Sequence, residues 1–306
     1  MTDRSDNVDA SVNVVVLGHV DHGKTMLATA ISRVCAEVYG GEAVDFSTVD
    51  TAAAQKEPVP FEAAVVECDS NKRRYALTDF PSHGDLTKAM LQRDPYDAAI
   101  LVVSAADGPM PQSSEHVLFA HQTGIPHILV FLNKADLVDD GELVDAVELE
   151  VRDLLATYDY PGDRCTVIVG SARQASEGVD HNEMGISAVR KLVEALDTEV
   201  PDRAAQSRPQ PAVASRFIGE VYLLSAEEGG RTTPLPADPS LQLAFPAGDG
   251  AGTGELPQGL SSAMPGDNFQ MTITLSRPVA MAQGTRFQIR EDGRTIGIGV
   301  VAKALD

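Results

Sequence analysis

Eight residues near the start of the chain, Gly18 to Thr25, restrict its possible folds more than any other stretch. They read Gly-His-Val-Asp-His-Gly-Lys-Thr and fit the phosphate-binding pattern G-x-x-x-x-G-K-[ST]. The apolar, β-branched run Val12 to Leu17 precedes them, and the helix-like segment Met26 to Val38 follows. This order predicts a strand, a loop and a helix whose positive N-terminal end faces a bound phosphate.

The residues of this loop have separate expected roles. Its glycines let the chain turn tightly, so that successive backbone N–H groups point towards phosphate oxygens. We expect Lys24, a catalytic as well as a binding residue, to reach the β- and γ-phosphates, and the Thr25 hydroxyl to coordinate Mg²⁺. The expected phosphate contacts are Gly18, His19, Val20, Asp21, His22, Gly23, Lys24 and Thr25. The alternative is a chance match in a glycine-containing βα turn, and the strand and helix on either side argue against it.

Length and composition limit the class of protein. The 306 residues suffice for two domains, and 43% hydrophobic residues can form ordinary cores. A formal net charge of −21 argues against a broad basic surface for wrapping nucleic acid. We see no apolar run long enough to span a membrane and no secretory start, so we expect a cytoplasmic protein. The cysteines, expected to be reduced and structural, are Cys35, Cys68 and Cys165.

The stretch after the first helix alternates between strand-like and helix-like patterns. Two strand-like runs, Phe61 to Asp69 and Arg73 to Asp79, flank a plausible hairpin turn. Ala98 to Ser104 and Pro126 to Leu132 are typical of buried strands, with a helix-like segment at Gln112 to Thr123 between them. Three further segments, a helix, a strand and a helix, are Glu142 to Thr157, Thr166 to Val169 and Ile186 to Leu196. The alternation predicts an α/β fold with a mostly parallel sheet.

Asp79 stands at the end of one of these predicted strands. In phosphate-loop nucleotide hydrolases an aspartate in this place holds Mg²⁺, usually through water. An aspartate that caps the following turn is the simpler interpretation of the residue alone. Its position after the phosphate loop favours the metal role.

A second motif, Asn133-Lys134-Ala135-Asp136, follows another predicted strand and has the N-K-x-D arrangement of guanine-nucleotide proteins. An aspartate carboxylate can accept two hydrogen bonds from the N1–H and N2–H₂ edge of guanine, which adenine does not offer. Asn133 would hold the base and the loop, and the stem of Lys134 would cover the face of the base. Further along, Ser171 and Ala172 could place backbone donors against the guanine oxygen.

The last third of the chain has a different pattern. A proline-containing stretch, 201–213, is typical of a linker and divides a nucleotide-binding domain, 1–200, from a second domain, 214–306. Short alternating runs in the second domain predict one small antiparallel β-barrel. Its expected strands are Phe217 to Leu224, Leu241 to Phe245, Asn268 to Leu275, Thr285 to Ile289 and Thr295 to Ala302. We expect the glycine-rich stretch Pro246 to Gly254 to be a turn.

With these residues in view, the chain resembles the elongation factor Tu family of translational GTPases. The resemblance rests on the loop and N-K-x-D motifs and on stretches such as Ala106 to Gln112, Glu228 to Arg231 and Met264 to Asn268. It implies a cytosolic, monomeric GTPase that uses Mg²⁺, carries aminoacyl-tRNA to the ribosome and is recharged by an exchange factor. His83 matches the family histidine that positions the attacking water.

Three departures from the family change what the resemblance implies. The linker leads directly into what resembles the last barrel, so the middle barrel, which forms much of the pocket for aminoacylated tRNA, is missing. The first switch stretch, Glu57 to Phe61, offers no threonine, and its prolines lack a backbone donor. The second switch stretch, Asp79 to Ser82, ends in serine where the family has glycine. We expect guanine-nucleotide binding to survive and discrimination between GDP and GTP to weaken.

These expectations lead to alternative functions. The first is a GTP phosphohydrolase of the elongation factor Tu type, with the ribosome and an exchange factor as partners and aminoacyl-tRNA doubtful. The second is a truncated paralogue that holds GDP or GTP with little turnover and engages a translation partner without delivering tRNA. A third is a decayed relative without a selected activity.

Overall fold

The computed structural model describes residues 11–44, 63–80, 83–92, 96–201, 211–226, 228–257 and 259–305. Contacts within the chain divide it into two compact units. The first consists of Met1–Ser82, Tyr96–His121 and Ile125–Gln206, and the second of His83–Pro95, Gln122–Gly124 and Ser207–Asp306. Most of the predicted linker lies outside the described residues, and its last part already belongs to the first strand of the second unit.

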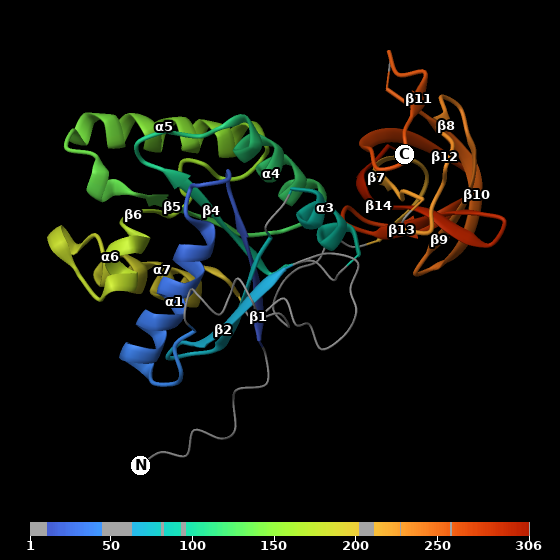
Figure 1. Cartoon of the computed structure of the whole chain (residues 1–306). Helices are drawn as coiled ribbons and strands as arrows, with labels where there is room; N and C mark the ends of the chain where they lie inside the picture. The colour runs from blue at the N-terminus through green and yellow to red at the C-terminus, as the bar shows by residue number, and fades with distance from the viewer. Residues whose placement is uncertain are drawn as a thin grey trace. The chain divides into compact units, whose positions relative to one another are not determined.

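The first unit is built on a six-stranded sheet with the strand order β2-β3-β1-β4-β5-β6 (Figure 1). The strands are β1 (Val12–Leu17), β2 (Ala64–Asp69), β3 (Arg74–Asp79), β4 (Ala98–Ser104), β5 (Ile128–Asn133) and β6 (Val167–Val169). All neighbouring pairs are parallel except β2 with β3, which form the predicted hairpin. The structure therefore confirms a mostly parallel sheet. Because parallel strands end at the same edge, residues that follow β1, β3 and β5 come together there.

Helices connect these strands and cover the sheet. They are α1 (Lys24–Tyr39), α4 (Pro111–Gln122), α5 (Gly141–Thr157), α6 (Ala172–Glu177) and α7 (Ile186–Glu199), with short 3₁₀ turns at Ala135–Leu137 and His181–Glu183. On one face, apolar side chains of α1, α6 and α7 form a single core with alternate residues of the central strands. Leu27 and Ile31 of α1 are almost completely buried in it. Burial of each such side chain stabilises the unit by about 1.5–3 kcal/mol. This packing holds α1 against the sheet.

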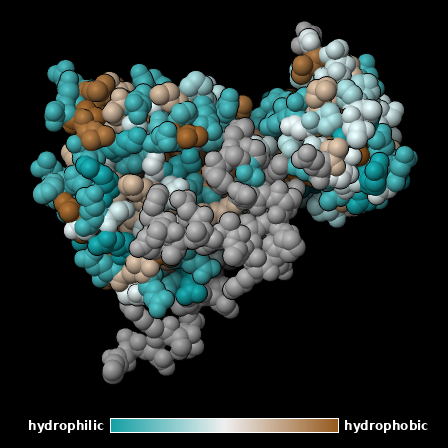
Figure 2. Space-filling model, viewed as in Figure 1, coloured by the Kyte–Doolittle hydropathy of each residue, from teal (hydrophilic) through white to brown (hydrophobic). Residues whose placement is uncertain are grey.

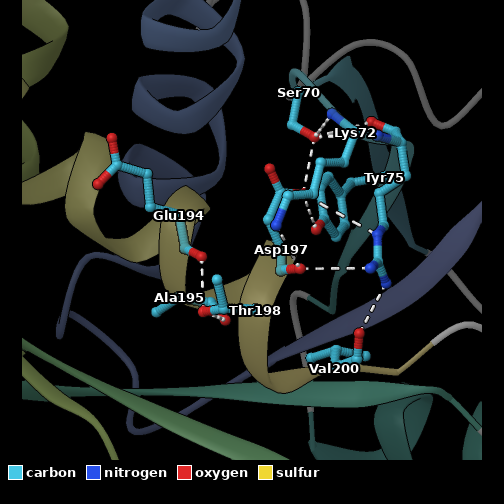
Figure 3. A network of polar contacts seen from close by, with 9 residues as sticks. Ser70, Lys72, Tyr75, Glu194, Ala195, Asp197, Thr198 and Val200 are labelled. Atoms are coloured by element: carbon cyan, nitrogen blue, oxygen red, sulfur yellow. Dashed lines mark hydrogen bonds and ion pairs between the residues drawn. The ribbon is translucent and has the colours of Figure 1, made fainter.

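A polar network fastens the β2–β3 hairpin to the end of α7 (Figure 3). The buried carboxylate of Asp197 accepts hydrogen bonds from the Tyr75 hydroxyl at 2.6 Å and the Ser70 hydroxyl at 2.8 Å. The Arg73 guanidinium donates to the backbone carbonyl of Val200 at 2.7 Å. A buried carboxylate is stable only when it is paired and hydrogen-bonded, so these contacts hold the hairpin in one position.

The second unit contains a closed barrel with the strand order β10-β12-β7-β14-β13-β9, in which every recorded pair is antiparallel. Its strands are β7 (Ala212–Leu223), β9 (Ser240–Phe245), β10 (Gly248–Glu255), β12 (Asn268–Met281), β13 (Arg286–Glu291) and β14 (Arg294–Ala304). Two short strands, β8 (Leu235–Pro236) and β11 (Ser262–Ala263), pair separately. Inside the barrel the rings of Phe217, Phe245 and Phe287 pack with centroids 5.4–5.9 Å apart. The predicted antiparallel barrel is confirmed.

The prediction of a turn at Pro246 to Gly254 is wrong, because β10 occupies most of this stretch and pairs with both β9 and β12. Glycine has a low intrinsic preference for strands, which is why the sequence suggested a turn. Here its small size is required. A Cβ atom at Gly252 would lie 2.3 Å from the Thr274 carbonyl oxygen, and one at Gly254 would lie 2.6 Å from the Met271 methyl group. Close packing within the barrel therefore overrides the local preference.

The second unit also includes helix α3 (His83–Gln92), which contacts β7 and β14.

Figure 2 shows mainly hydrophilic residues on the visible face, with hydrophobic side chains in small separate groups. Large hydrophobic residues that are exposed in the structure include Leu137 and Leu149. No helix in the described ranges has both the length and the apolar character needed to cross a membrane.

Candidate functional site

A cavity of about 520 Å³ lies in the first unit where β1, β3 and β5 end. This volume is in the range of small-ligand sites. Residues from four separate stretches line it, and these are Val20, Asp21, Gly23, Lys24, Thr25, Met26, Asp79, Phe80, Asn133, Lys134, Asp136, Leu137, Ser171 and Arg173. The cavity therefore brings together the loop, the end of β3 and the N-K-x-D motif, which are far apart in the sequence.

Two glycines give the loop its shape. Gly18 has φ +134°, and a Cβ atom there would lie 2.2 Å from the Val102 carbonyl oxygen. Gly23 has φ +89°, and a Cβ atom there would lie 2.3 Å from the Asn133 amide nitrogen. Both conformation and space thus require glycine. Since Gly23 is the N-cap of α1 and has no side chain to cap it, the first backbone N–H groups of the helix are left for an anion.

Side chains of α4 hold the other end of the loop. Gln112 and His116 are one helical turn apart and so lie on the same face of α4. The backbone N–H of Gly18 donates to His116 Nδ1 at 3.1 Å, and that of Val20 donates to Gln112 Oε1 at 3.3 Å. The sequence analysis did not identify these supports, although Gln112 ends one of the stretches that carry the family resemblance.

Two titratable side chains of the loop, those of Lys24 and His22, are partly or fully removed from water. Burial lowers the pKa of the Lys24 ammonium, against the opposing effect of Asp79 and Asp21. Its Nζ donates to the carbonyl of His19 at 3.1 Å. Burial also lowers the pKa of His22, whose ring is only 2% exposed. A poorly solvated ammonium group would gain strongly from a phosphate nearby.

The residues expected to bind metal adjoin the phosphate loop. The Thr25 hydroxyl donates directly to Oδ2 of Asp79, a residue that is only 4% exposed. A hydroxyl and a carboxylate are both hard oxygen donors, which Mg²⁺ prefers, and this cation usually takes its other ligands from phosphates and water. Among the described residues no cluster of three His, Cys, Asp or Glu side chains forms a metal site. The donor pair therefore fits Mg²⁺ bound together with a nucleotide.

Asn133 connects the base end of the cavity to the loop. Its amide donates to the carbonyl of His22 at 2.8 Å, and its Oδ1 accepts from the backbone N–H of Ala172 at 2.9 Å. Lys134, beside it, lines the cavity with φ +61°, an uncommon conformation for a residue with a side chain. One asparagine thus fixes two loops that surround the same space.

Asp136 also lines the cavity, but the structure gives it a partner that the sequence analysis did not anticipate. The Arg173 guanidinium lies 2.7 Å from its Oδ2. Burial alone would raise the pKa of the Asp136 carboxyl, but hydrogen bonds from Ser171 and Arg173 lower it below the ordinary value. The carboxylate is therefore ionised at neutral pH and able to accept hydrogen bonds.

The structure brings most of the predicted contact residues to one place. Exceptions are Gly18, His19, His22 and Ala172, which are not among the lining residues and instead shape or support the loops. His83 begins α3, and its side chain lies outside the described part of the structure, as do both altered switch stretches, Glu57 to Phe61 and Pro81-Ser82. Lining residues that the sequence analysis missed are Met26, Phe80, Leu137 and Arg173.

Comparison with protein families agrees with this site. Residues 9–202 match the model of the elongation factor Tu GTP-binding domain, and residues 210–305 match that of the elongation factor Tu C-terminal domain. Only seven residues, 203 to 209, separate the two matches, too few for a β-barrel. The chain therefore belongs to the elongation factor Tu family of translational GTPases, without the middle barrel between its two domains.

Proposed function

We propose that this chain is a Mg²⁺-dependent GTP phosphohydrolase of the elongation factor Tu type that acts in translation elongation as a cytoplasmic monomer. The observation that supports this most is the single cavity that combines the phosphate loop, the Thr25–Asp79 pair and the N-K-x-D residues. In this proposal residues 1–200 bind the nucleotide, and a linker that starts at residue 201 and ends where β7 begins, at Ala212, leads into the barrel domain.

The phosphates would lie against the start of α1. The backbone N–H groups from Gly18 to Thr25 and the ammonium of Lys24 would bind their oxygens, because both the helix end and the amine favour negative charge. Thr25 and Asp79 would hold Mg²⁺, which when bound would neutralise part of the phosphate charge. The contact between these two side chains would then open to admit the cation.

The base would lie between the N-K-x-D turn and the Ser171–Ala172 turn. Asp136 would accept hydrogen bonds from N1–H and N2–H₂ of guanine, and the stem of Lys134 would cover the base. Asn133 would keep the two turns together through its bonds to His22 and Ala172. An adenine base offers neither of these donors to the Asp136 carboxylate, so we expect it to bind more weakly than guanine.

For hydrolysis, His83 would orient a water molecule towards the γ-phosphorus. The water oxygen forms a bond to phosphorus while the bond to the β–γ bridging oxygen breaks, and the products are GDP and inorganic phosphate. Lys24 would stabilise the charge that develops on the bridging oxygen.

The altered switch sequences favour a second candidate function, that of a nucleotide-holding module with little turnover. The phosphate loop and N-K-x-D contact parts common to GDP and GTP, whereas the switches sense the γ-phosphate. A ligand shifts a conformational equilibrium only by its difference in affinity for the two states. Such a module would engage the ribosome or an exchange factor, and without a middle barrel it would not deliver aminoacyl-tRNA in the family's manner.

Titration of nucleotide-stripped protein with fluorescent GDP and a non-hydrolysable GTP analogue, with and without Mg²⁺, tests the proposal. We expect both nucleotides to bind, with little difference between them, and Asp136→Asn to lose the preference for guanine. Asp139→Asn, an exposed change outside the cavity lining, is the matched control. No binding of either nucleotide would refute the proposal.

Measured GTP hydrolysis, with and without ribosomes, separates the two candidates. Turnover that ribosomes accelerate and that His83→Ala abolishes supports the enzyme. Binding of both nucleotides without turnover under either condition supports the nucleotide-holding module.

A further inference from the structure

At the base end of the cavity, the guanidinium of Arg173 forms an ion pair with Asp136, the carboxylate expected to recognise guanine. Arg173 Nη2 lies 2.7 Å from Asp136 Oδ2, and both residues line the cavity. The Asp136 side chain is only 7% exposed, whereas the Arg173 side chain is 60% exposed. The arginine therefore reaches in from the rim, and the carboxylate lies inside.

This arrangement changes what guanine gains by binding. An unpaired buried carboxylate would gain greatly from the two guanine N–H donors, because nothing else would satisfy its charge. In this structure Arg173 and Ser171 already donate to it and neutralise part of its charge. Guanine therefore meets a carboxylate that already has partners, and the net gain is smaller.

Among the described residues, Asp136 is the recorded hydrogen-bond acceptor of the Arg173 guanidinium, and the charge of Glu177 adds to the attraction. Arg173 is the second residue of the short helix α6, and its side chain is 60% exposed. The recorded contact with Asp136 joins one guanidinium nitrogen to one carboxylate oxygen and is not the stronger bidentate form. Half-exposed ion pairs contribute little, so a base could displace the arginine at a modest cost in affinity, up to about fivefold.

We propose that Arg173 competes with the guanine base for the Asp136 carboxylate, and that a bound guanine displaces it. Arg173 thereby weakens guanine-nucleotide binding and speeds nucleotide release. It acts indirectly, as a positioning residue, through its ion pair with Asp136. This inference rests on the proposed function, because it assumes that the cavity binds guanine nucleotides. It describes a device in this chain that would make nucleotide exchange easier without a partner.

The first test compares GDP affinity and release rate for the wild type, Arg173→Leu and Arg173→Lys. Fluorescent GDP is titrated at equilibrium and then chased with unlabelled GDP in a stopped-flow instrument. We expect Arg173→Leu to bind GDP up to about fivefold more tightly and to release it more slowly, with Arg173→Lys close to the wild type. Arg164→Leu, which removes an 83% exposed arginine outside the cavity lining, should change neither quantity.

The salt dependence of GDP affinity distinguishes an ionic effect of Arg173 from an effect of the substitution on packing. Raising NaCl from about 0.05 M to about 0.5 M screens the Arg173–Asp136 pair, so the advantage of Arg173→Leu over the wild type should shrink towards one. A packing effect would leave the ratio of the two affinities unchanged.

A double-mutant cycle shows whether Arg173 acts through Asp136. In the Asp136→Asn background the amide can donate to the oxygen at position 2 of xanthine, so xanthosine diphosphate is the probe. We expect Arg173→Leu to have no effect on its affinity in that background, because the ion pair is already gone.

The outcomes distinguish this inference from the proposed function. If Arg173→Leu binds GDP as the wild type does or more weakly, or if its effect persists in Asp136→Asn, the inference is overturned while GDP binding stands. If the wild type binds no GDP, the proposed function fails and the inference fails with it. Circular dichroism confirms that each variant is folded.

Discussion

Glu220 on β7 of the barrel has a carboxyl group that is buried and almost completely shielded from water. The residue is only 6% exposed, and within the described part of the chain its Oε2 has no hydrogen-bond partner. Burial raises the pKa of its carboxyl from 4.5 to about 7, although hydrogen bonds from Gln270 and Asn268 act in the opposite direction. The folded state therefore favours the protonated form, and ionisation of Glu220 should destabilise the barrel.

The sign and size of the effect follow from linkage. The carboxyl binds a proton more tightly in the folded than in the unfolded chain, so the free energy of unfolding falls as pH rises from about 4.5 to about 7 and then levels off. A pKa difference of about 2.5 corresponds to roughly 3 kcal/mol, at 1.36 kcal/mol for each pH unit. Glu220→Gln keeps the shape and stays neutral. It should stabilise the protein by about 3 kcal/mol at pH 8 and by less than about 1 kcal/mol at pH 5.

Urea unfolding at pH 5 and pH 8 measures this difference. Far-UV circular dichroism is the suitable probe because the chain contains no tryptophan. Glu255→Gln, a change at an exposed glutamate of β10, is the control and should have a small effect at both pH values. If Glu220→Gln is no more stable than the wild type at pH 8, or gains equally at both pH values, the assignment of a buried, protonated carboxyl is refuted.

Three other properties of the fold can be tested in the same way. The three cysteines are buried, and burial raises the pKa of the Cys165 thiol to about 12. We therefore expect no reaction with a thiol reagent at pH 8 until the protein is denatured. Asp197→Ala should lower the free energy of unfolding by about 2–4 kcal/mol because it leaves the Tyr75 hydroxyl buried without an acceptor, whereas Tyr75→Phe should cost about 1 kcal/mol. Equal costs in urea unfolding would contradict a central role for the carboxylate. Gly252→Ala should destabilise the barrel by about 1–3 kcal/mol, because its methyl group would clash with the Thr274 carbonyl oxygen, and an unchanged melting temperature would show that β10 has more space than the structure indicates.

Much of the nucleotide site could be predicted from the sequence because its motifs are local. The pattern from Gly18 to Thr25 specifies a loop between a strand and a helix, and the structure has β1 and α1 in these places. Asp79 ends one predicted strand and Asn133 follows another, and strands of a parallel sheet end at one edge. The order of the motifs together with this topological rule was enough to place them in one site.

Local patterns also failed where glycine has two opposite uses. The stretch of β10 reads as a turn because glycine is flexible, yet between β9 and β12 the same residues form a strand because only they fit. Strand pairing across the barrel determines this outcome, and a local window does not contain it.

The sequence by itself therefore determined the α/β and barrel domains, the phosphate loop and the identity of most groups that line the cavity. Only the tertiary structure decided how those groups are held. His116 supports Gly18, Asn133 joins two loops, and Arg173 pairs with Asp136. The physical reason is that each of these bonds joins residues at least 37 positions apart in the chain. No helical or strand period links such positions, so the contacts exist only once the sheet has brought them together.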